Sequence, residues 1–236
     1  MRPALLIAAN FLRQHRWPVL LLFAWIVLTA AATGDFGRSR PVNVDVYFYL
    51  QQQAIFICIF SAFLAADAIH SERKSRRILL LLSKSISRGQ YLLAVIAATW
   101  ITAIAYAILS AVCGVWLTAH AMLSSAGLWP LFLLVIAGAL ISASVAMFFS
   151  TFLNPYLATG FTLALFCIPA AWLAARHAGA LWWPGFSLLL QFLNFTLRPD
   201  WAPRWSAAGA ALLESVVFWG LAAAVFERRD IAVPVE

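Results

Sequence analysis

The sequence predicts an all-α polytopic membrane protein with six transmembrane helices. Of its 236 residues, 64% are hydrophobic and only 11% are charged, whereas soluble domains carry about 45–50% apolar and about 25% charged residues. The mean hydropathy is +0.89, and charge-free apolar runs recur along the chain. So little charge cannot cover a surface exposed to water. This excludes a soluble globular enzyme and indicates that lipid is the solvent.

Six apolar runs approach or exceed the roughly 20 residues that a helix needs to cross a bilayer. The expected spans are Trp17–Thr33, Val46–Ile69, Tyr91–Ala119, Leu128–Leu153, Pro155–Ala175 and Ser206–Phe226. Each is expected to be helical, because an isolated segment in hydrocarbon must satisfy its own backbone hydrogen bonds. We divide the single transmembrane domain 1–236 into an interfacial helix (1–16), spans one and two (17–69), a cytoplasmic coupling segment (70–90), spans three to five (91–175), external helices (176–205), span six (206–227) and a cytoplasmic tail (228–236).

The residues before the first span have an amphipathic pattern. Within Pro3–Arg16, one face carries Leu5, Ala8, Ala9 and Leu12. This favours an interfacial helix on the cytoplasmic surface, with an irregular tail as the alternative. The triplet Ala30-Ala31-Ala32 at the end of the first apolar run resembles a signal-peptidase site, which would leave five spans.

A seventh apolar run, Ala180–Leu197, is interrupted by Trp182-Trp183-Pro184-Gly185 and contains Gln191 and Asn194. With six spans, the basic residues divide eleven to five in favour of the side that holds both termini and the segment 70–90. By the positive-inside rule both termini are then cytoplasmic. We therefore interpret the seventh run as one or two short helices in the outer leaflet.

No sequence motif for covalent chemistry or nucleotide binding is present. The sequence contains no G-x-x-x-x-G-K-[ST], H-E-x-x-H, C-x-x-C or G-x-S-x-G pattern. The three cysteines fall in apolar runs and the four histidines are scattered near span edges. We expect no metal site and no disulfide in this chain.

Polar side chains inside spans are functional candidates, because a charge at mid-helix costs about 2.5–3.5 kcal/mol on insertion scales. Glu214 lies near the middle of the last span; it could line a substrate pathway, pair across a dimer or sit protonated in the bundle. Gln52 and Gln53 are further candidate pathway residues, and one or two of Gln51, Gln52 and Gln53 are expected to face helices or water instead of lipid. Asp67 is expected to form a local ion pair with His70 or Arg73.

A stripe of small residues runs along the fourth span. It comprises Gly138, Ser142 and Ala146, which recur every four residues. Such a stripe is typical of close helix packing rather than of a ligand site.

The segment Ser71–Gln90 holds six of the sixteen basic residues, which flank the apolar run Ile78–Leu82. This run is too short to cross a membrane. An apolar patch in a charged loop is costly to expose unless it docks onto something. Two interpretations remain open: a topology-setting loop on anionic lipid, or a docking helix for a cytoplasmic partner.

This segment resembles the cytoplasmic loop of type-2 ABC transporter permeases. Glu72 falls on the family's first acid, Leu80-Leu81-Leu82 on its leucine run, and Ile86-Ser87-Arg88 on its closing motif. The chain departs from the family pattern at Lys74, where a second acid is common, at Arg76-Arg77, where Gly-Thr is common, and at Ser85, where proline is usual. The ending Phe226-Glu227-Arg228-Arg229-Asp230 also resembles the Phe-x-x-Arg-Asp of many such permeases.

The resemblance implies the membrane subunit of an ATP-driven exporter in a bacterial inner membrane. It implies a second permease chain, identical or homologous, and two separate ATPase subunits that bind ATP and Mg, with no nucleic acid and no catalysis in this chain. The residues implied in coupling to the ATPase are Glu72, Arg76, Arg77, Leu81, Leu82, Ser87 and Arg88. The scarcity of charge in the spans suggests an amphipathic or lipid-like substrate.

Two other classes of function remain open. An ion-coupled secondary transporter would use Glu214 as a proton carrier. An intramembrane enzyme would need several acids, histidines or metal ligands at one depth, and the sequence places Glu214 alone.

Overall fold

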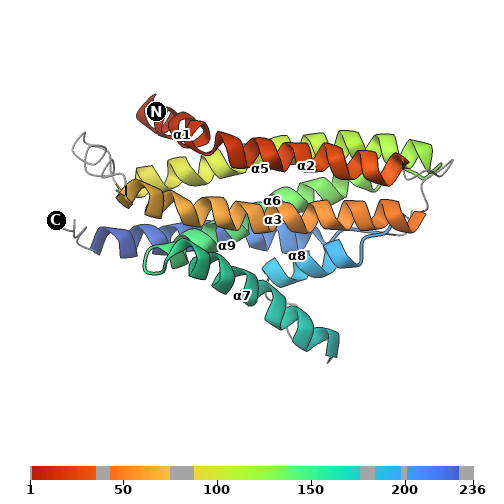
Figure 1. Ribbon diagram of the computed structural model, residues 1–236. Helices are drawn as coiled ribbons and strands as arrows, with labels where there is room; N and C mark the ends of the chain where they lie inside the picture. The colour runs from red at the N-terminus through yellow and green to blue at the C-terminus, as the bar shows by residue number, and fades with distance from the viewer. Residues whose placement is uncertain (1, 36–42, 75–87, 176–183, 198–200, 229–236) are drawn as a thin grey trace.

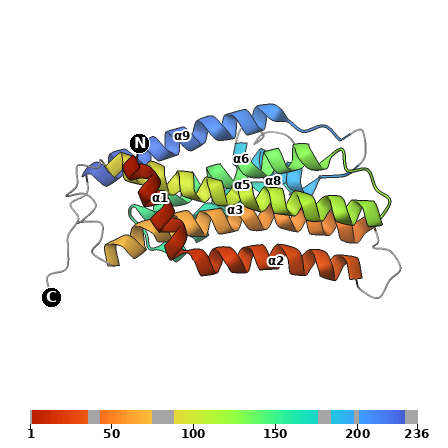
Figure 2. The ribbon, with the colours of Figure 1, turned by 90° about the horizontal axis from the view of Figure 1, so that it is seen from above.

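The computed structural model describes residues 2–35, 43–74, 88–175, 184–197 and 201–228. Within these ranges every regular element is a helix, which confirms the all-α class. The helices are α1 (Arg2–Gln14), α2 (Arg16–Asp35), α3 (Asn43–Lys74), α5 (Arg88–His120), α6 (Leu128–Ser150), α7 (Pro155–Ala175), α8 (Pro184–Leu193) and α9 (Trp205–Arg228). The long helices form an elongated bundle, which α1 crosses at one end (Figures 1 and 2).

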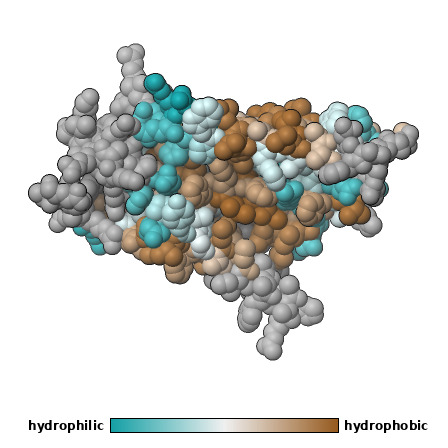
Figure 3. Space-filling view, in the orientation of Figure 1, coloured by the Kyte–Doolittle hydropathy of each residue, from teal (hydrophilic) through white to brown (hydrophobic). Residues whose placement is uncertain are grey.

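Among the described residues, five helices are long and apolar enough to cross a membrane: α2, α3, α5, α6 and α9. Helix α7 has the bounds of the predicted fifth span, and its residues Pro155–Cys167 form an apolar stretch over the part whose side chains the structure describes. On the face seen in Figure 3, hydrophobic side chains cover the middle of the bundle and hydrophilic ones lie toward its ends. The chain is therefore a multi-pass membrane protein.

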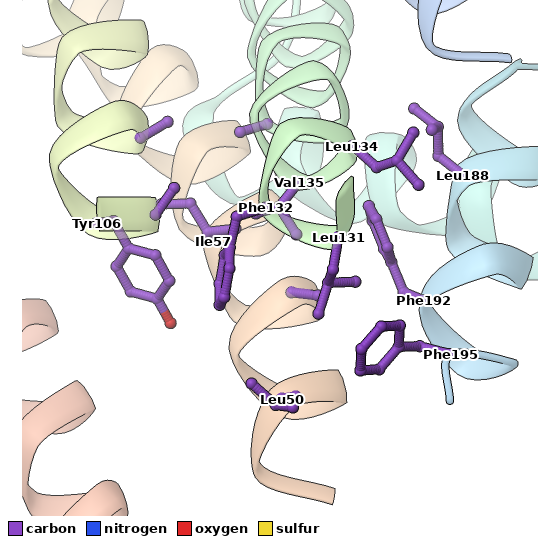
Figure 4. Close-up of a cluster of buried hydrophobic side chains, with 14 of the residues drawn as sticks. Leu50, Ile57, Tyr106, Leu131, Phe132, Leu134, Val135, Leu188, Phe192 and Phe195 are labelled. Carbon is purple, nitrogen blue, oxygen red and sulfur yellow. The ribbon is translucent and has the colours of Figure 1, made fainter. Parts of the chain in front are cut away.

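Helix α6 forms the centre of the bundle. It packs against α3, α5, α7, α8 and α9. In Figure 4, Phe132 lies on the side of α6 toward Tyr106 of α5, and Leu131 lies on the side toward Phe192 and Phe195. All four of these aromatic side chains are buried.

The small residues of α6 let neighbouring helices approach closely. A Cβ atom added at Gly138 would lie 3.1 Å from Sγ of Cys58 and 3.1 Å from Cζ of Phe192. Ser142 and Ala146 are also buried. The structure thus confirms the predicted packing role of this stripe.

Helix α1 is amphipathic, as predicted, but its buried face differs from the predicted one. Ile7, Ala8 and Phe11 are buried and pack in one cluster with residues of α3 and α5, whereas Ala9 is exposed. The apolar face meets protein because the ends of α3 and α5 offer apolar surface directly beneath it. The assignment of Ala9 to that face was wrong.

The chain bends sharply at His15, between α1 and α2 (Figure 2). Pro18 follows in the first turn of α2 and has no amide hydrogen to donate to the carbonyl of Gln14, so the two helices cannot continue as one. The bend brings α2 parallel to the bundle and leaves α1 lying across the ends of α3 and α5.

Helix α8 spans only 10 residues, or about 15 Å at 1.5 Å per residue, half of the hydrocarbon thickness of about 30 Å. The described part of the seventh apolar run thus contains one short helix. The place of this helix in the outer leaflet stays a prediction. Residues 176–183 lie outside the described ranges.

Candidate functional site

Two of the predicted coupling residues, Glu72 and Arg88, lie at one end of the bundle. Glu72 is in the last turn of α3, and Arg88 is the first residue of α5. Figures 1 and 2 place these two helix ends near α1 and near the end of α9. The other coupling residues, Arg76, Arg77, Leu81, Leu82 and Ser87, lie outside the described residues. Their coupling role stays a prediction.

An ion pair ties the α1–α2 bend to α3 at the same end. Nε2 of His15 lies 3.1 Å from Oδ2 of Asp67, and Nδ1 lies 3.0 Å from the carbonyl oxygen of Phe11. A carbonyl oxygen only accepts hydrogen bonds, so Nδ1 carries the proton in its contact with Phe11, and Nε2 faces the carboxylate of Asp67. His70, one of the two expected local partners of Asp67, is exposed, and the described ion pair is made by a residue 52 positions away. The side chain of Arg73, the other expected partner, lies outside the described residues.

A buried hydrogen-bond network joins α2, α3 and α5. The hydroxyl of Tyr106 donates to Oε1 of Gln53, and Nε2 of Gln53 donates to Oγ1 of Thr29 at 3.0 Å. Thr29 in turn donates to the carbonyl of Trp25 at 2.7 Å. Gln53 and Tyr106 have no exposed surface. Gln53 therefore links three helices through its side chain, and its role as a pathway residue stays a prediction.

The neighbouring glutamines have other environments. Nε2 of Gln51 donates to the carbonyl of Leu193 at 2.9 Å and so ties α3 to the end of α8. Gln52 is half-buried. The expectation that some of these glutamines face helices is confirmed for Gln51 and Gln53.

Glu214 lies midway along α9 and its side chain is half-buried. Its Oε2 atom is shielded from solvent and has no hydrogen-bond partner among the residues that the structure describes. Helix α9 packs against α5, α6 and α8, while Gln53 lies on α3. The structure does not bring Glu214 together with Gln52 and Gln53.

An apolar cavity of about 120 Å³ opens between α3, α6, α7 and α8. Cys58, Gly138, Phe166, Leu188 and Phe192 are among the residues that line it. For scale, a dry cavity of about 150 Å³ in another protein binds benzene. Sequence reasoning missed this cavity because four helices far apart in the chain contribute to it; the small stripe of α6 was its one local signal.

The opposite face of α8 borders a recess of about 230 Å³ with a mixed lining. Its polar residues are Ser187, Gln191, Asn194 and Arg204, and its apolar ones are Leu190, Trp201 and Ala202. Oε1 of Gln191 accepts a hydrogen bond from the backbone amide of Arg204 at 2.6 Å. Helix α8 thus separates an apolar cavity from a recess that also offers polar groups.

Within the described ranges, no group of three or more His, Cys, Asp or Glu side chains could hold a metal ion. Cys58, Cys113 and Cys167 are free thiols. No protein-family model matches the chain, and no curated protein matches it.

Proposed function

We propose that this chain is the six-span membrane subunit of an ATP-driven exporter, inserted in a bacterial inner membrane with both termini in the cytoplasm. It would pair with a second permease chain, identical or homologous, and with two separate ATPase subunits that bind ATP and Mg. Helix α7 would be the fifth of its six spans. The chain itself would carry out no covalent chemistry.

The observation that carries this proposal is the length of α3 and α5. With 32 and 33 residues, they measure about 48 and 50 Å, well beyond the hydrocarbon thickness of about 30 Å. Their ends at Lys74 and Arg88 flank the basic segment that resembles a permease coupling loop. A force on that segment would act directly on two helices that pack against the central α6.

The bend between α1 and α2 supports the same mechanism. The His15–Asp67 pair fixes α1 to the last turns of α3, and the buried side chains Ile7 and Phe11 pack against α3 and α5. Movement of the α3 and α5 ends would therefore carry α1 and α2 with it. The result would be a two-state shift of the bundle, biased by the partner ATPase.

The two faces of α8 support an amphipathic or lipid-like substrate. The apolar cavity beside Phe192 suits a hydrocarbon group, and the recess at Gln191 and Arg204 offers donors and a positive charge. The recess lies beside the start of α9, at the end of the bundle that is external in the proposed topology, whereas the cavity lies deeper in the bundle, beside Cys58 and Gly138 at the middle of α3 and α6.

Purification from native membranes tests the proposal. The tagged chain is extracted in mild detergent, and the eluate is examined for a second protein with a G-x-x-x-x-G-K-[ST] motif and for vanadate-sensitive ATP hydrolysis. We expect both. A chain that purifies without an ATPase, and that transports in liposomes on a proton gradient alone, would contradict the proposal.

Transport on a proton gradient without an ATPase would favour a proton-coupled secondary transporter. The observation that speaks for this alternative is the unpartnered, shielded Oε2 atom of Glu214 in the described part of the bundle. An intramembrane acid without a counter-charge is a common proton-carrying device. Loss of gradient-driven transport in Glu214→Gln would then identify the carrier.

A further inference from the structure

The bend between α1 and α2 forms an open polar recess of about 450 Å³. It is lined by Asn10, Arg13, Gln14, Arg16 and Trp17. The α1 residues in this set lie on the face opposite the one that packs on α3 and α5. The recess therefore faces away from the bundle.

The positive charge of this recess is not compensated within the described part of the chain. Arg13 and Arg16 are both exposed, and the acid closest to the bend along the packed helices, Asp67, is engaged by His15 on the bundle side. None of the residues lining the recess is acidic. Two guanidinium groups beside the amides of Asn10 and Gln14 form a site suited to an anion with further hydrogen-bonding groups.

An apolar ridge continues from this recess along α2. Trp17 is 65% exposed, and Leu21 and Leu28 are 71% and 65% exposed on the same side of the helix. The guanidinium carbon of Arg16 lies 5.5 Å from the ring centroid of Trp17. An exposed tryptophan at the start of an apolar helix is typical of the membrane–water interface.

We propose that this bend binds one anionic phospholipid, with its phosphodiester headgroup between Arg13 and Arg16 and its acyl chains along Leu21 and Leu28. The amides of Asn10 and Gln14 would bond the polar headgroup substituent, and the Trp17 ring would lie at the level of the glycerol esters. A free phosphate ion would use only the charged half of this surface. The charged recess and the apolar ridge together match a lipid.

The site is built before the lipid arrives. The His15 ring holds α1 against α3 through Asp67, and Pro18 stabilises the bend, so the backbone positions of the two arginines are set relative to each other. Lipid binding would in turn stabilise the bend that braces the ends of α3 and α5. The inference does not depend on whether a separate ATPase drives this chain.

Native mass spectrometry of the delipidated full chain with dioleoylphosphatidylglycerol or dioleoylphosphatidylcholine tests the inference. We expect one tightly bound phosphatidylglycerol and weaker binding of phosphatidylcholine. In the variant Arg13→Gln/Arg16→Gln, phosphatidylglycerol affinity should fall about 30-fold, from about 1 kcal/mol per basic residue near a membrane surface and 1.4 kcal/mol per tenfold. Arg228→Gln, which removes an exposed charge at the end of α9 and outside the recess, should retain the wild-type affinity.

Several results would overturn the proposal. Equal phosphatidylglycerol binding by the double variant and wild type would remove the arginines from the site. An equal loss in Arg228→Gln would mean that net charge alone attracts the lipid, and full displacement by millimolar inorganic phosphate would mean that the ligand is a free anion. Loss of a co-purifying protein from the double variant, with lipid binding unchanged, would make the recess a protein contact. The single variant Arg16→Gln repeats the test if the double variant does not fold.

Discussion

Helices α6 and α9 have nearly the same length, 23 and 24 residues, yet opposite environments. In α6, 78% of the most apolar stretch is buried inside the bundle; in α9 only 22% is. In water, the hydrophobic effect would bury both. In a bilayer the lipid tails are as apolar as leucine, so close packing decides which helix becomes central. Gly138 gives α6 that close packing, whereas Gly209 of α9 has no atom within 4 Å of an added Cβ.

The largest change in stability is expected when a large side chain disturbs the close packing around Gly138 of α6. Gly138→Leu would push a side chain into Cys58 and Phe192, and overpacking of this kind costs about 1–3 kcal/mol. Gly209→Leu places the same side chain in open space and should change stability by less than about 0.5 kcal/mol. Thermal unfolding of both variants in detergent measures the difference. Equal unfolding temperatures would mean that α6 is not the packed centre.

A second prediction concerns the buried hydrogen bonds on the other side of α6. Gln53→Leu would leave the hydroxyls of Tyr106 and Thr29 without this partner, at a cost of about 1–2 kcal/mol, because a buried polar group that loses its partner keeps its desolvation penalty. Gln52→Leu, at a half-buried position, is the matched control and should cost less. The free energy of unfolding in mixed detergent micelles checks both. A Gln53 variant as stable as the Gln52 variant would show that the network is dispensable.

A smaller, local loss of stability is expected at the bend between α1 and α2. Asp67→Asn removes the carboxylate opposite His15 and should cost about 0.5–1.5 kcal/mol, the range of a partly buried hydrogen bond. Amide hydrogen exchange over residues 7–14 should accelerate, because α1 loses its tether to α3. His70→Asn, one turn further along α3 and exposed, should leave that exchange unchanged. Unaltered exchange in Asp67→Asn would mean that Phe11 and its apolar neighbours hold α1 alone.

The smallest change in stability is expected at Glu214. Glu214→Gln should shift stability by less than about 0.5 kcal/mol, since removal of an intramembrane charge relieves its insertion cost. If the residue lines the pathway, substrate-stimulated ATP hydrolysis by the assembled complex should change while basal hydrolysis persists. Transport and stimulated hydrolysis identical to wild type would return Glu214 to a passive position on the lipid-facing helix.

Hydropathy predicted the helices well because the long apolar runs of this chain admit few other structures. Composition and proline chemistry alone predict the start of α6 at Leu128 and the start of α7 at Pro155. The side-chain oxygen of Asn154 accepts a hydrogen bond from the amide of Leu157 at 2.8 Å, which caps α7. The buried face of α1 was harder to predict, because an amphipathic pattern does not show whether lipid or protein covers the apolar side chains.

The candidate sites were harder to predict, because they join residues that are distant in sequence. Helical spacing suggested His70 as the partner of Asp67, yet His15 makes the ion pair across 52 positions. Gln53 was recognised as polar within a span, but Tyr106, its partner in the next long helix, gave no signal of its own. A sequence pattern identifies the residues that share one face of one helix, whereas each of these sites is formed by side chains from two or more helices.

The proposal that an ATPase drives this bundle through residues 70–90 is tested most directly by partner retention. The variant Leu81→Ser/Leu82→Ser is compared with wild type and with Leu81→Met/Leu82→Met, which keeps the apolar surface, at equal expression. Burial of one leucine side chain contributes about 1.5–3 kcal/mol, so the serine variant should bind its ATPase about ten- to several-hundred-fold more weakly, and the methionine variant nearly as well as wild type. Full retention of the ATPase by the serine variant, with sensitivity to anionic lipid content instead, would contradict the account.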